Sequence, residues 1–374
     1  MTSSSAPHDP PPADASPGEP LPHRGSGAAP TLESVAAAAG VSRATASRVL
    51  NGSPRVSEAA RTSVLAAAET LSYVPNGAAR MLVTRRSDAV AFVVCEQEEV
   101  FFSDPFFATV LKGAHRVVVR SGRQVLFVVV ADDGDRRRLE RFAAGGHLDA
   151  AMFLSVHADE PVPARLAALG LPVVLAGRPP AGVGDDLFHV DTDNVEGGRL
   201  AARRLLERGC RRPVAVTGPV DMSGGEDRLV GFREVLRENG VQLPTTHRQS
   251  GGYTVDGGRE ATARLLARVP DLDALFAAND LMAVGALGAL REHGRSVPED
   301  VAVIGYDDIP LAAVTTPALT TVRQPLVELG HRMATALVAT LDAAAGRGGP
   351  ARPEDLAAHR GDPLRTRLVL RGSA

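Results

Sequence analysis

The sequence predicts an α/β protein in which a small all-α unit precedes a larger body of doubly wound parallel sheets. After residue 88, seven continuous apolar runs lack the alternation of a half-exposed strand, which is typical of strands buried on both faces of a parallel sheet. Helical stretches separate those runs, whereas residues 31–74 hold only short helical segments with capping residues. A chain of 374 residues is too long for one ordinary core and indicates two or three domains.

The first thirty residues differ in composition from the rest of the chain. They hold eight prolines and lack the apolar stretch of a signal peptide, so residues 1–30 are predicted to form a disordered tail. No segment approaches the roughly 18 continuous apolar residues of a membrane span. The two cysteines, Cys95 and Cys210, have no metal-ligand spacing. These observations predict a cytoplasmic protein without membrane contact, metal or cofactor.

Three short helices are predicted between residues 31 and 74. Thr31 caps the first, which Gly40 ends, and Ser42 caps the second, which runs to about Leu50. Ser57 caps the third, which stops at YVPN. The tight turn with a glycine between the first two helices is typical of a helix-turn-helix module, with a plain three-helix bundle as the alternative.

The second of these helices has two faces of different character. Ala46, Val49 and Leu50 follow the i, i+3, i+4 pattern of a packing stripe. The other face carries small and cationic residues: Arg43, Ala44, Ser47 and Arg48. Residues 31–86 contain seven arginines against three glutamates, a net charge of +4, although the whole chain carries -3. A basic module on an acidic body is expected when only the module contacts phosphate, which indicates double-stranded DNA as the partner.

The body alternates apolar and helical segments. The predicted strands are AVAFVV (89–94), QVLFVVV (124–130), AAMFL (150–154), PVVLA (172–176), PVAVTG (213–218), ALFAAN (274–279) and VAVIGYDD (301–308). The predicted helices between them include residues 105–119, 197–208, 227–239 and 281–293. A body of about 285 residues with this texture suffices for two sheets.

Several long motifs point to one family. Near the N-terminus they are TLESVAAAAGVSRATASRVLNGSPRVSEAAR and LSYVPNGAARML. In the body they are DTDNVEGGRLAARRLLERG, DRLVGFREVLRENG, ALFAANDLMAVGALGALREHG, VPEDVAVIGYDDI and PALTTVRQPLVELG. Over residues 31–371 the sequence resembles the lactose-repressor family of transcription regulators. The resemblance implies a repressor whose affinity for DNA is controlled by a bound small molecule.

The resemblance also implies a division of the chain. It gives a helix-turn-helix DNA-binding domain at residues 31–74, a hinge helix and linker at 75–87, and an effector-binding and dimerisation domain at 88–374. That last domain would be periplasmic-binding-protein-like, with an N-subdomain at about 88–192 and 326–350 and a C-subdomain at about 193–322 and 354–371.

In this family the second helix enters the major groove and the hinge helix enters the minor groove. The DNA contacts implied here are Arg43, Ala44, Thr45, Ser47, Arg48, Asn51, Asn76 and Leu82. Arginine suits bidentate contact with guanine, whereas Thr45 and Asn51 are expected to contact the backbone or cap helices. Leu82 would be the apolar wedge that kinks a palindromic operator, with an ordinary linker residue as the alternative.

The family binds its small molecule between the two subdomains. Arg228, Asn279 and Asp307 match its ligand-contacting positions, and together they supply the donors and acceptors that paired hydroxyl groups need. Phe107 and Tyr253 match positions where an aromatic ring stacks on a sugar or a base, with a core role as the alternative for each. The expected effector is a sugar or sugar derivative, and a purine, nucleoside or corepressor-type ligand is the alternative.

Some positions depart from the family pattern. Gly177 stands where the family's namesake has an aspartate that contacts sugar, and Leu326 replaces a phenylalanine of the pocket. The segment CEQEEVFFSDPFF is longer and more acidic than usual. Glu98 and Asp104 in this segment could reach a ligand, but we expect them to be solvated charges.

Other functions and assemblies fit the sequence less well. A sugar-binding transport protein shares the architecture of the body, but the helix-turn-helix module and the missing export signal argue against it. Asp307 and Asp308 could serve acid–base catalysis, but no nucleophile triad, metal cluster or phosphate loop accompanies them, so no enzyme is expected. No apolar heptads follow Leu370, which predicts a homodimer and not a tetramer.

Overall fold

The computed structural model describes residues 30–50, 55–74, 86–180, 183–184, 186–347 and 351–374. These residues form two compact units, which divide between Arg80 and Met81. Residues 1–29 of the predicted tail and most of the predicted hinge lie outside the described residues, as do Asn51, Asn76 and Leu82. Among the described helices, none combines the length and the apolar character that a membrane crossing needs.

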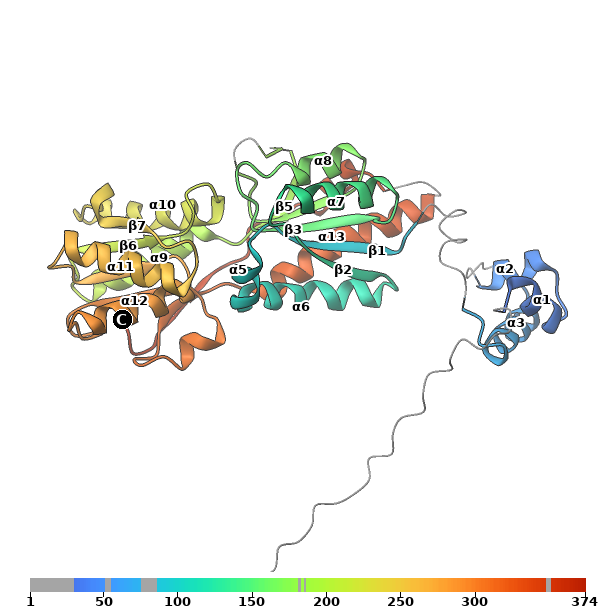
Figure 1. Cartoon of the computed structure of the whole chain (residues 1–374), viewed down its shortest axis with the longest axis horizontal. Helices are drawn as coiled ribbons and strands as arrows, with labels where there is room; N and C mark the ends of the chain where they lie inside the picture. Colours follow the sequence, from blue (N-terminus) through green and yellow to red (C-terminus); the bar gives the residue numbers. More distant parts are fainter. Residues whose placement is uncertain (1–29, 51–54, 75–85, 181–182, 185, 348–350) are drawn as a thin grey trace, which may run out of the picture. The chain divides into compact units, whose positions relative to one another are not determined.

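The N-terminal unit consists of α1 (Leu32–Ala38), α2 (Arg43–Leu50) and α3 (Glu58–Thr70) (Figure 1). The predicted caps are confirmed: the side chains of Thr31, Ser42 and Ser57 accept hydrogen bonds from backbone N–H groups of the helices that follow. The three helices bury a small apolar core that consists of Val35, Ala36, Ala46, Val49, Val64, Ala67 and Ala68. The predicted packing stripe of α2 faces this core, which leaves the cationic face of the helix outward.

The N-subdomain contains a five-stranded parallel sheet in the order β2-β1-β3-β4-β5. Its strands are β1 (Ala89–Val94), β2 (Gln124–Val129), β3 (Ala150–Leu154), β4 (Val173–Ala176) and β5 (Phe188–Val190). Its helices are α5 (Glu98–Ser103), α6 (Pro105–Arg120), α7 (Asp133–Ala144), α8 (Val162–Ala168) and α13 (Leu326–Arg347). One face of the sheet packs against α6 and α13 and the other against α7 and α8 (Figure 1).

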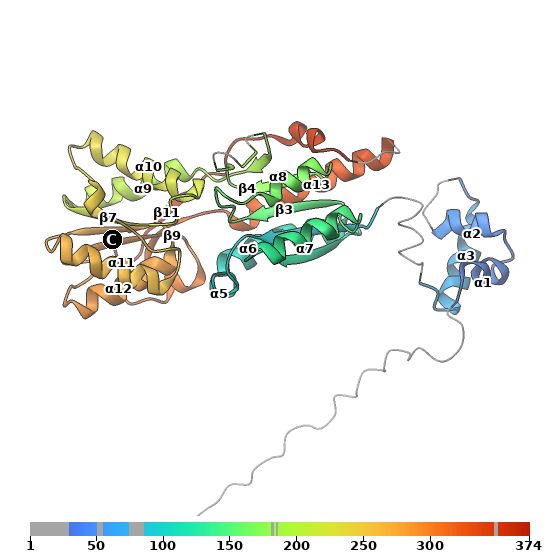
Figure 2. The same cartoon turned by 45° about the horizontal axis from the view of Figure 1, so that its top comes forward.

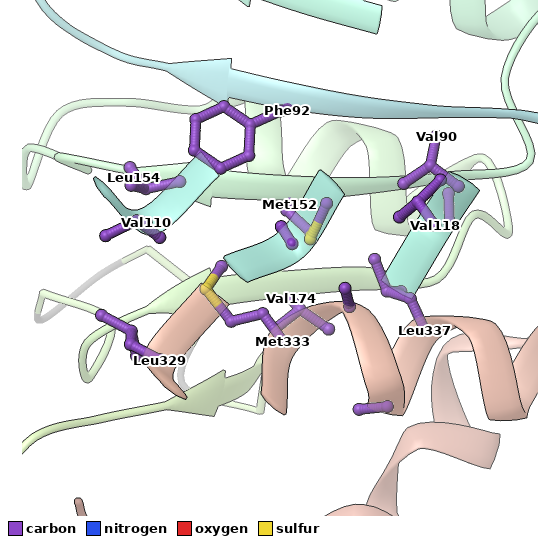
Figure 3. Packing of buried hydrophobic residues seen from close by; sticks show 14 of the residues in the cluster. Val90, Phe92, Val110, Val118, Met152, Leu154, Val174, Leu329, Met333 and Leu337 are labelled. Carbon is purple, nitrogen blue, oxygen red and sulfur yellow. The ribbon is translucent and has the colours of Figure 1, made fainter. Parts of the chain in front are cut away.

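The prediction of strands buried on both faces holds for β1 and β3 and is wrong for β2. Every residue of β1 and β3 is buried, because their side chains alternate between the two helix layers. Figure 3 shows one of these layers, in which Phe92 and Met152 of the sheet meet Met333 and other side chains of the helices. Strand β2 lies at the sheet edge, so Gln124 is exposed and Phe127 keeps 41% of its surface in solvent.

The C-subdomain contains a six-stranded sheet in the order β11-β10-β9-β8-β6-β7. Its strands are β6 (Pro213–Thr217), β7 (Arg248–Ser250), β8 (Ala274–Ala277), β9 (Ala302–Asp307), β10 (Thr320–Arg323) and β11 (Arg367–Val369). All are parallel except β11, which runs antiparallel to β10 at the edge. The helices α9 (Asn194–Glu207) and α10 (Ser223–Glu238) cover one face, and α11 (Val255–Arg268) and α12 (Asp280–Glu292) cover the other (Figure 2).

The chain crosses between the subdomains three times. It passes from β5 to α9, returns from β10 to α13, and passes again from the 3-10 helix η3 (Pro353–His359) to β11. The crossings lie side by side: Thr192 pairs with Leu364 in a parallel bridge, and the Thr192 hydroxyl donates to Gln324 Oε1 at 2.6 Å. Neither subdomain is therefore a continuous segment of the chain.

Three pairs of helices pack with their backbones in close approach. Each pair has one glycine on either side: Gly113 and Gly330 join α6 to α13, Gly198 and Gly231 join α9 to α10, and Gly258 and Gly285 join α11 to α12. A Cβ atom at Gly113 would lie 2.0 Å from the carbonyl oxygen of Val327, and one at Gly231 would lie 1.8 Å from that of Val195. The close packing therefore requires glycine at these positions.

Candidate functional site

The carboxyl ends of strands from both sheets line a cavity that is open to solvent. The N-subdomain contributes residues that follow β1, β3 and β4, together with the start of α6. The C-subdomain contributes the start of α10 and residues that follow β7, β8 and β9. All five residues predicted to bind the effector line this cavity: Phe107, Arg228, Tyr253, Asn279 and Asp307.

Arg228, on the first turns of α10, is fixed deep in the wall of the cavity. Its Nε donates to Asn194 Oδ1 at 2.9 Å, and its Nη1 donates to the carbonyl oxygen of Ala278 at 2.5 Å. The guanidinium lies 4.0 Å from the ring centre of Tyr306, an approach that adds cation–π stabilisation. Within the described residues, no hydrogen bond of Nη2 accompanies those of Nε and Nη1.

Asp307 is the carboxylate partner of Arg228. Arg228 Nη1 lies 3.7 Å from Asp307 Oδ1, and the same oxygen accepts a hydrogen bond from Gln324 Nε2 at 2.5 Å. Burial raises the pKa of Asp307, while the charge of Arg228 opposes that shift. Because Gln324 also accepts from Thr192, the carboxylate is bonded directly to one of the three crossing segments and through Gln324 to a second.

Asn279 has a structural role in addition to its place on the cavity wall. It caps α12, since its Oδ1 accepts from the N–H of Met282 at 2.9 Å. Its Nδ2 donates to the carbonyl oxygen of Tyr253 at 3.1 Å. The amide therefore fixes the backbone of Tyr253, which has a positive φ of 59°. Asn279 therefore positions the aromatic residue as well as lining the cavity.

The two aromatic residues differ in burial. Phe107 is 3% exposed and belongs to the apolar core of the N-subdomain, and it also lines the cavity. The core role and the cavity position are therefore both present. Tyr253 is half-buried, and its ring covers Gly218, where a Cβ atom would lie 2.2 Å from the ring. The two rings come from opposite subdomains.

The expectation that Asp104 is a solvated charge is wrong. This carboxylate is 8% exposed, lines the cavity and caps α6 by accepting from the N–H of Phe106 at 2.8 Å. Desolvation, followed by the charge of Asp307, raises the pKa of Asp104 to about 7. Glu98 is exposed, as expected. The sequence signal was Asp-Pro directly before an apolar helix, which is a helix start.

One of the two predicted substitutions lies on the cavity wall and the other does not. Gly177 lines the cavity, with a positive φ of 91°. Leu326 belongs to the core between α6 and α13, and Leu329, one turn further along α13, reaches the cavity instead. The two residues share one face of α13 and belong to the same core, so they differ in their position along the helix axis, and only Leu329 also lines the cavity.

The described part of the predicted DNA-binding set lies on α2. Arg43, Ala44 and Arg48 are exposed, and Arg43 Nε forms an ion pair with Glu33 of α1 at 2.7 Å. Ser47 and Thr45 are half-buried, and the Thr45 hydroxyl lies 2.9 Å from that of Ser42 within the cap. The exposed face of α2 therefore presents two cationic side chains on either side of a small residue.

Comparison with protein families matches both units. Residues 31–76 match the bacterial regulatory proteins of the lacI family, and residues 202–374 match the periplasmic binding protein-like domain. The transcriptional regulator CelR of Thermobifida fusca is 46% identical over 309 residues, which cover 83% of this chain and 91% of that protein. The transcriptional regulator GalR of Escherichia coli K12 is 35% identical over 318 residues, which cover 83% and 89% of the two chains.

Solved structures show the same architecture. The CelR–cellobiose complex superposes with a TM-score of 0.69 at 41% identity, covering 92% of this chain and 100% of the other. The lac repressor dimer bound to operator superposes with a TM-score of 0.73 at 23% identity, covering 92% and 98%. The chain belongs to the lacI family of bacterial regulatory proteins and is a transcriptional regulator, not an enzyme.

Proposed function

We propose that this chain represses transcription from a palindromic operator and that a glucose-containing disaccharide, with cellobiose as the first candidate, controls its affinity for DNA. The carrying observation is the composition of the cavity wall: Arg228 lines it together with the carboxylates of Asp307 and Asp104 and the rings of Phe107 and Tyr253, and Arg228 Nη1 lies 3.7 Å from Asp307 Oδ1. Hydroxyl groups pair with such donors and acceptors, while aromatic rings pack on the apolar face of a sugar. The relative with 41% identity was solved with cellobiose.

The DNA-binding half of the proposal rests on α2. Arg43 and Arg48 read base edges or phosphates in the major groove, Ala44 contacts apolar base surface, and Ser47 and Thr45 position the helix. Asn51, Asn76 and Leu82 lie outside the described residues and remain part of the proposed set. The protein acts in the cytoplasm, where the operator is.

A homodimer supplies the two-fold symmetry that a palindrome requires. The edge strand β2 offers a surface for self-association, since Phe127 and the neighbouring Val119 of α6 are 41% and 47% exposed. The homologous structure with 23% identity is a dimer on operator DNA. We propose that a dimer pairs through this side of the N-subdomain.

The test measures ligand binding and its effect on DNA. Isothermal titration of the full chain with cellobiose is expected to show saturable binding, and the same sugar is expected to change operator affinity in fluorescence anisotropy. Galactose and adenine serve as comparison ligands. Binding of adenine without any sugar would favour the purine alternative. Failure of every sugar to bind would overturn the proposed effector class.

A further inference from the structure

Two ionic contacts join the subdomains beside the cavity. His157, in the loop after β3, places Nδ1 at 2.8 Å from Asp221 Oδ2, which precedes α10. Arg178, which follows β4, places Nη2 at 2.9 Å from Asp227 Oδ1 on α10. In both contacts a cation of the N-subdomain meets a carboxylate of the C-subdomain.

Both contacts end on one short stretch, residues 221–227, at the start of α10. Ser223 in this stretch also donates its hydroxyl to the carbonyl oxygen of Arg178. Arg228 follows immediately, and it lines the cavity. The start of α10 therefore contacts the opposite subdomain and the ligand space at the same time.

We propose that His157 and Arg178 clasp the two subdomains together through the start of α10, and that this clasp sets how tightly the cavity holds its effector. A ligand that contacts both walls of a cleft favours the conformation in which the walls are close, so contacts made only in that conformation add to its affinity. The inference about effector affinity rests on the proposed function, whereas the clasp itself is a property of the ligand-free chain.

The two halves of the clasp respond differently to pH. The charged groups that face His157 are Glu96, whose Oε1 lies 3.6 Å from Nε2, and Asp221. Glu160, in the same loop, is already paired with Arg136 of α7 at 3.0 Å. The carboxylate of Glu96, and then that of Asp221, raises the pKa of His157 to about 9 against the opposing effect of burial.

When the subdomains separate, Asp221 moves away from His157, whereas Glu96 stays beside it. The pKa of His157 is therefore lower in the open conformation than in the closed one. The charged ring then stabilises closure fully below the open-state pKa, and this contribution is lost as pH rises through about 9. Arg178 stays charged over this range, so its half of the clasp does not change with pH.

Titration with cellobiose at about pH 8 and about pH 10 separates these contributions, because Asp104, whose pKa on the same cavity wall is raised to about 7, is largely ionised at both pH values. For the wild-type chain, affinity is expected to fall about threefold to tenfold on going to the higher pH. His157→Gln is expected to bind more weakly at the lower pH and to lose the pH dependence. Asp227→Asn is expected to weaken binding by the same factor at both pH values. His147→Gln, at an exposed ring that lies beside Phe142, is the matched control and should behave as wild type.

A second measurement needs no ligand. In the full chain at one pH, amide hydrogen exchange in residues 221–227 is expected to be faster in His157→Gln and Asp227→Asn than in wild type. The His147→Gln control should show no change. Unchanged exchange in both clasp variants would overturn the clasp, whatever the sugar does. Faster exchange without cellobiose binding would keep the clasp and refute the proposed effector.

Discussion

Desolvation raises the pKa of Asp104 to about 7, so this carboxylate ionises within the ordinary working range of a protein. Its usual value is 3.8, which means that folding takes up a proton between about pH 4 and pH 7. The contribution of that proton to the free energy of unfolding is complete below the unfolded-state pKa and is lost as pH rises through 7. Above that pH the native state holds a buried negative charge.

Asp104→Asn is expected to raise the free energy of unfolding by about 1–3 kcal/mol at pH 8 and to change it little at pH 5. Asparagine keeps the cap on α6 while it removes the buried charge. Thermal unfolding at the two pH values measures this. Asp132→Asn, at the exposed cap of α7 whose pKa is lowered, is the matched control and should lose stability at pH 8. Equal effects of Asp104→Asn at both pH values would contradict the ionisation argument.

Arg43 is expected to read a base, because it is exposed on α2 and held by Glu33 through Nε alone. Arg43→Ala should cost about 1–3 kcal/mol on the best operator and relax sequence preference at one position. Arg43→Lys keeps the charge without the bidentate fork, so it should also relax preference while retaining affinity for random DNA. Anisotropy with operator variants measures both. Uniform weakening on all sequences would show that Arg43 contacts phosphate only.

At the residue scale, the sequence predicted positions on the cavity wall better than their environments. Arg228 and Asp307 could be placed because family motifs align the first with the start of a helix and the second with the end of a strand. Burial of Asp104 could not be foreseen, since it depends on α5 and on the facing wall of the C-subdomain closing over the carboxylate. The choice between Leu326 and Leu329, which share one face of α13, depends on where along the helix axis the cavity meets that face, which the sequence alone does not specify.

At the element scale, the glycine pairs determine how closely the helices approach each other. A Cβ atom at Gly198 would lie 2.0 Å from the carbonyl oxygen of Arg228, so alanine there must push α9 away from α10. Gly288, on α12, has no heavy atom near its Cβ position. These two glycines lie in helices of similar length and differ only in what surrounds them.

Gly198→Ala is expected to destabilise the body by about 1–3 kcal/mol through overpacking. Gly288→Ala is the matched control and should stabilise it by about 0.5–1 kcal/mol, because alanine is the better helix former and meets open space. Chemical denaturation with unchanged m-values would measure both. Stabilisation by both substitutions would mean that the α9–α10 contact relaxes without cost.

Elements with buried apolar runs were predictable, and short polar elements were not. Strands β1 and β3 coincide with their predicted residues. Their side chains point alternately to two helix layers, so every side chain is buried and apolar and the strand appears in the sequence as a continuous apolar run. The sequence predicted neither β7, whose residues Arg-Gln-Ser are all polar, nor β11, whose residues are Arg-Leu-Val; both strands are three residues long and lie at sheet edges. Their strand conformation depends on backbone pairing with β6 and β10, which leaves no hydrophobic pattern.

At the scale of the whole molecule, Arg228 is expected to transmit the effector signal without touching DNA. Arg228→Ala should abolish the response of operator affinity to cellobiose and leave affinity without sugar within a few-fold if the sugar is an inducer. If the sugar is a corepressor, Arg228→Ala should bind the operator weakly both with and without the sugar. Arg233→Ala, at an exposed position on the same helix, is the control that should respond normally. A normal response from Arg228→Ala would remove this residue from the effector site.

The three crossings between subdomains have a consequence for synthesis. The ribosome releases α1 to α3 first, and contacts local in sequence let that unit fold while the rest is still being made. Helix α6 follows, but its partner α13 emerges only after all of β6 to β10. The apolar side of the nascent N-subdomain thus waits uncovered during translation of more than a hundred residues, and such a surface is what chaperones recognise. The helix-turn-helix unit is therefore folded before the part that senses the effector is complete.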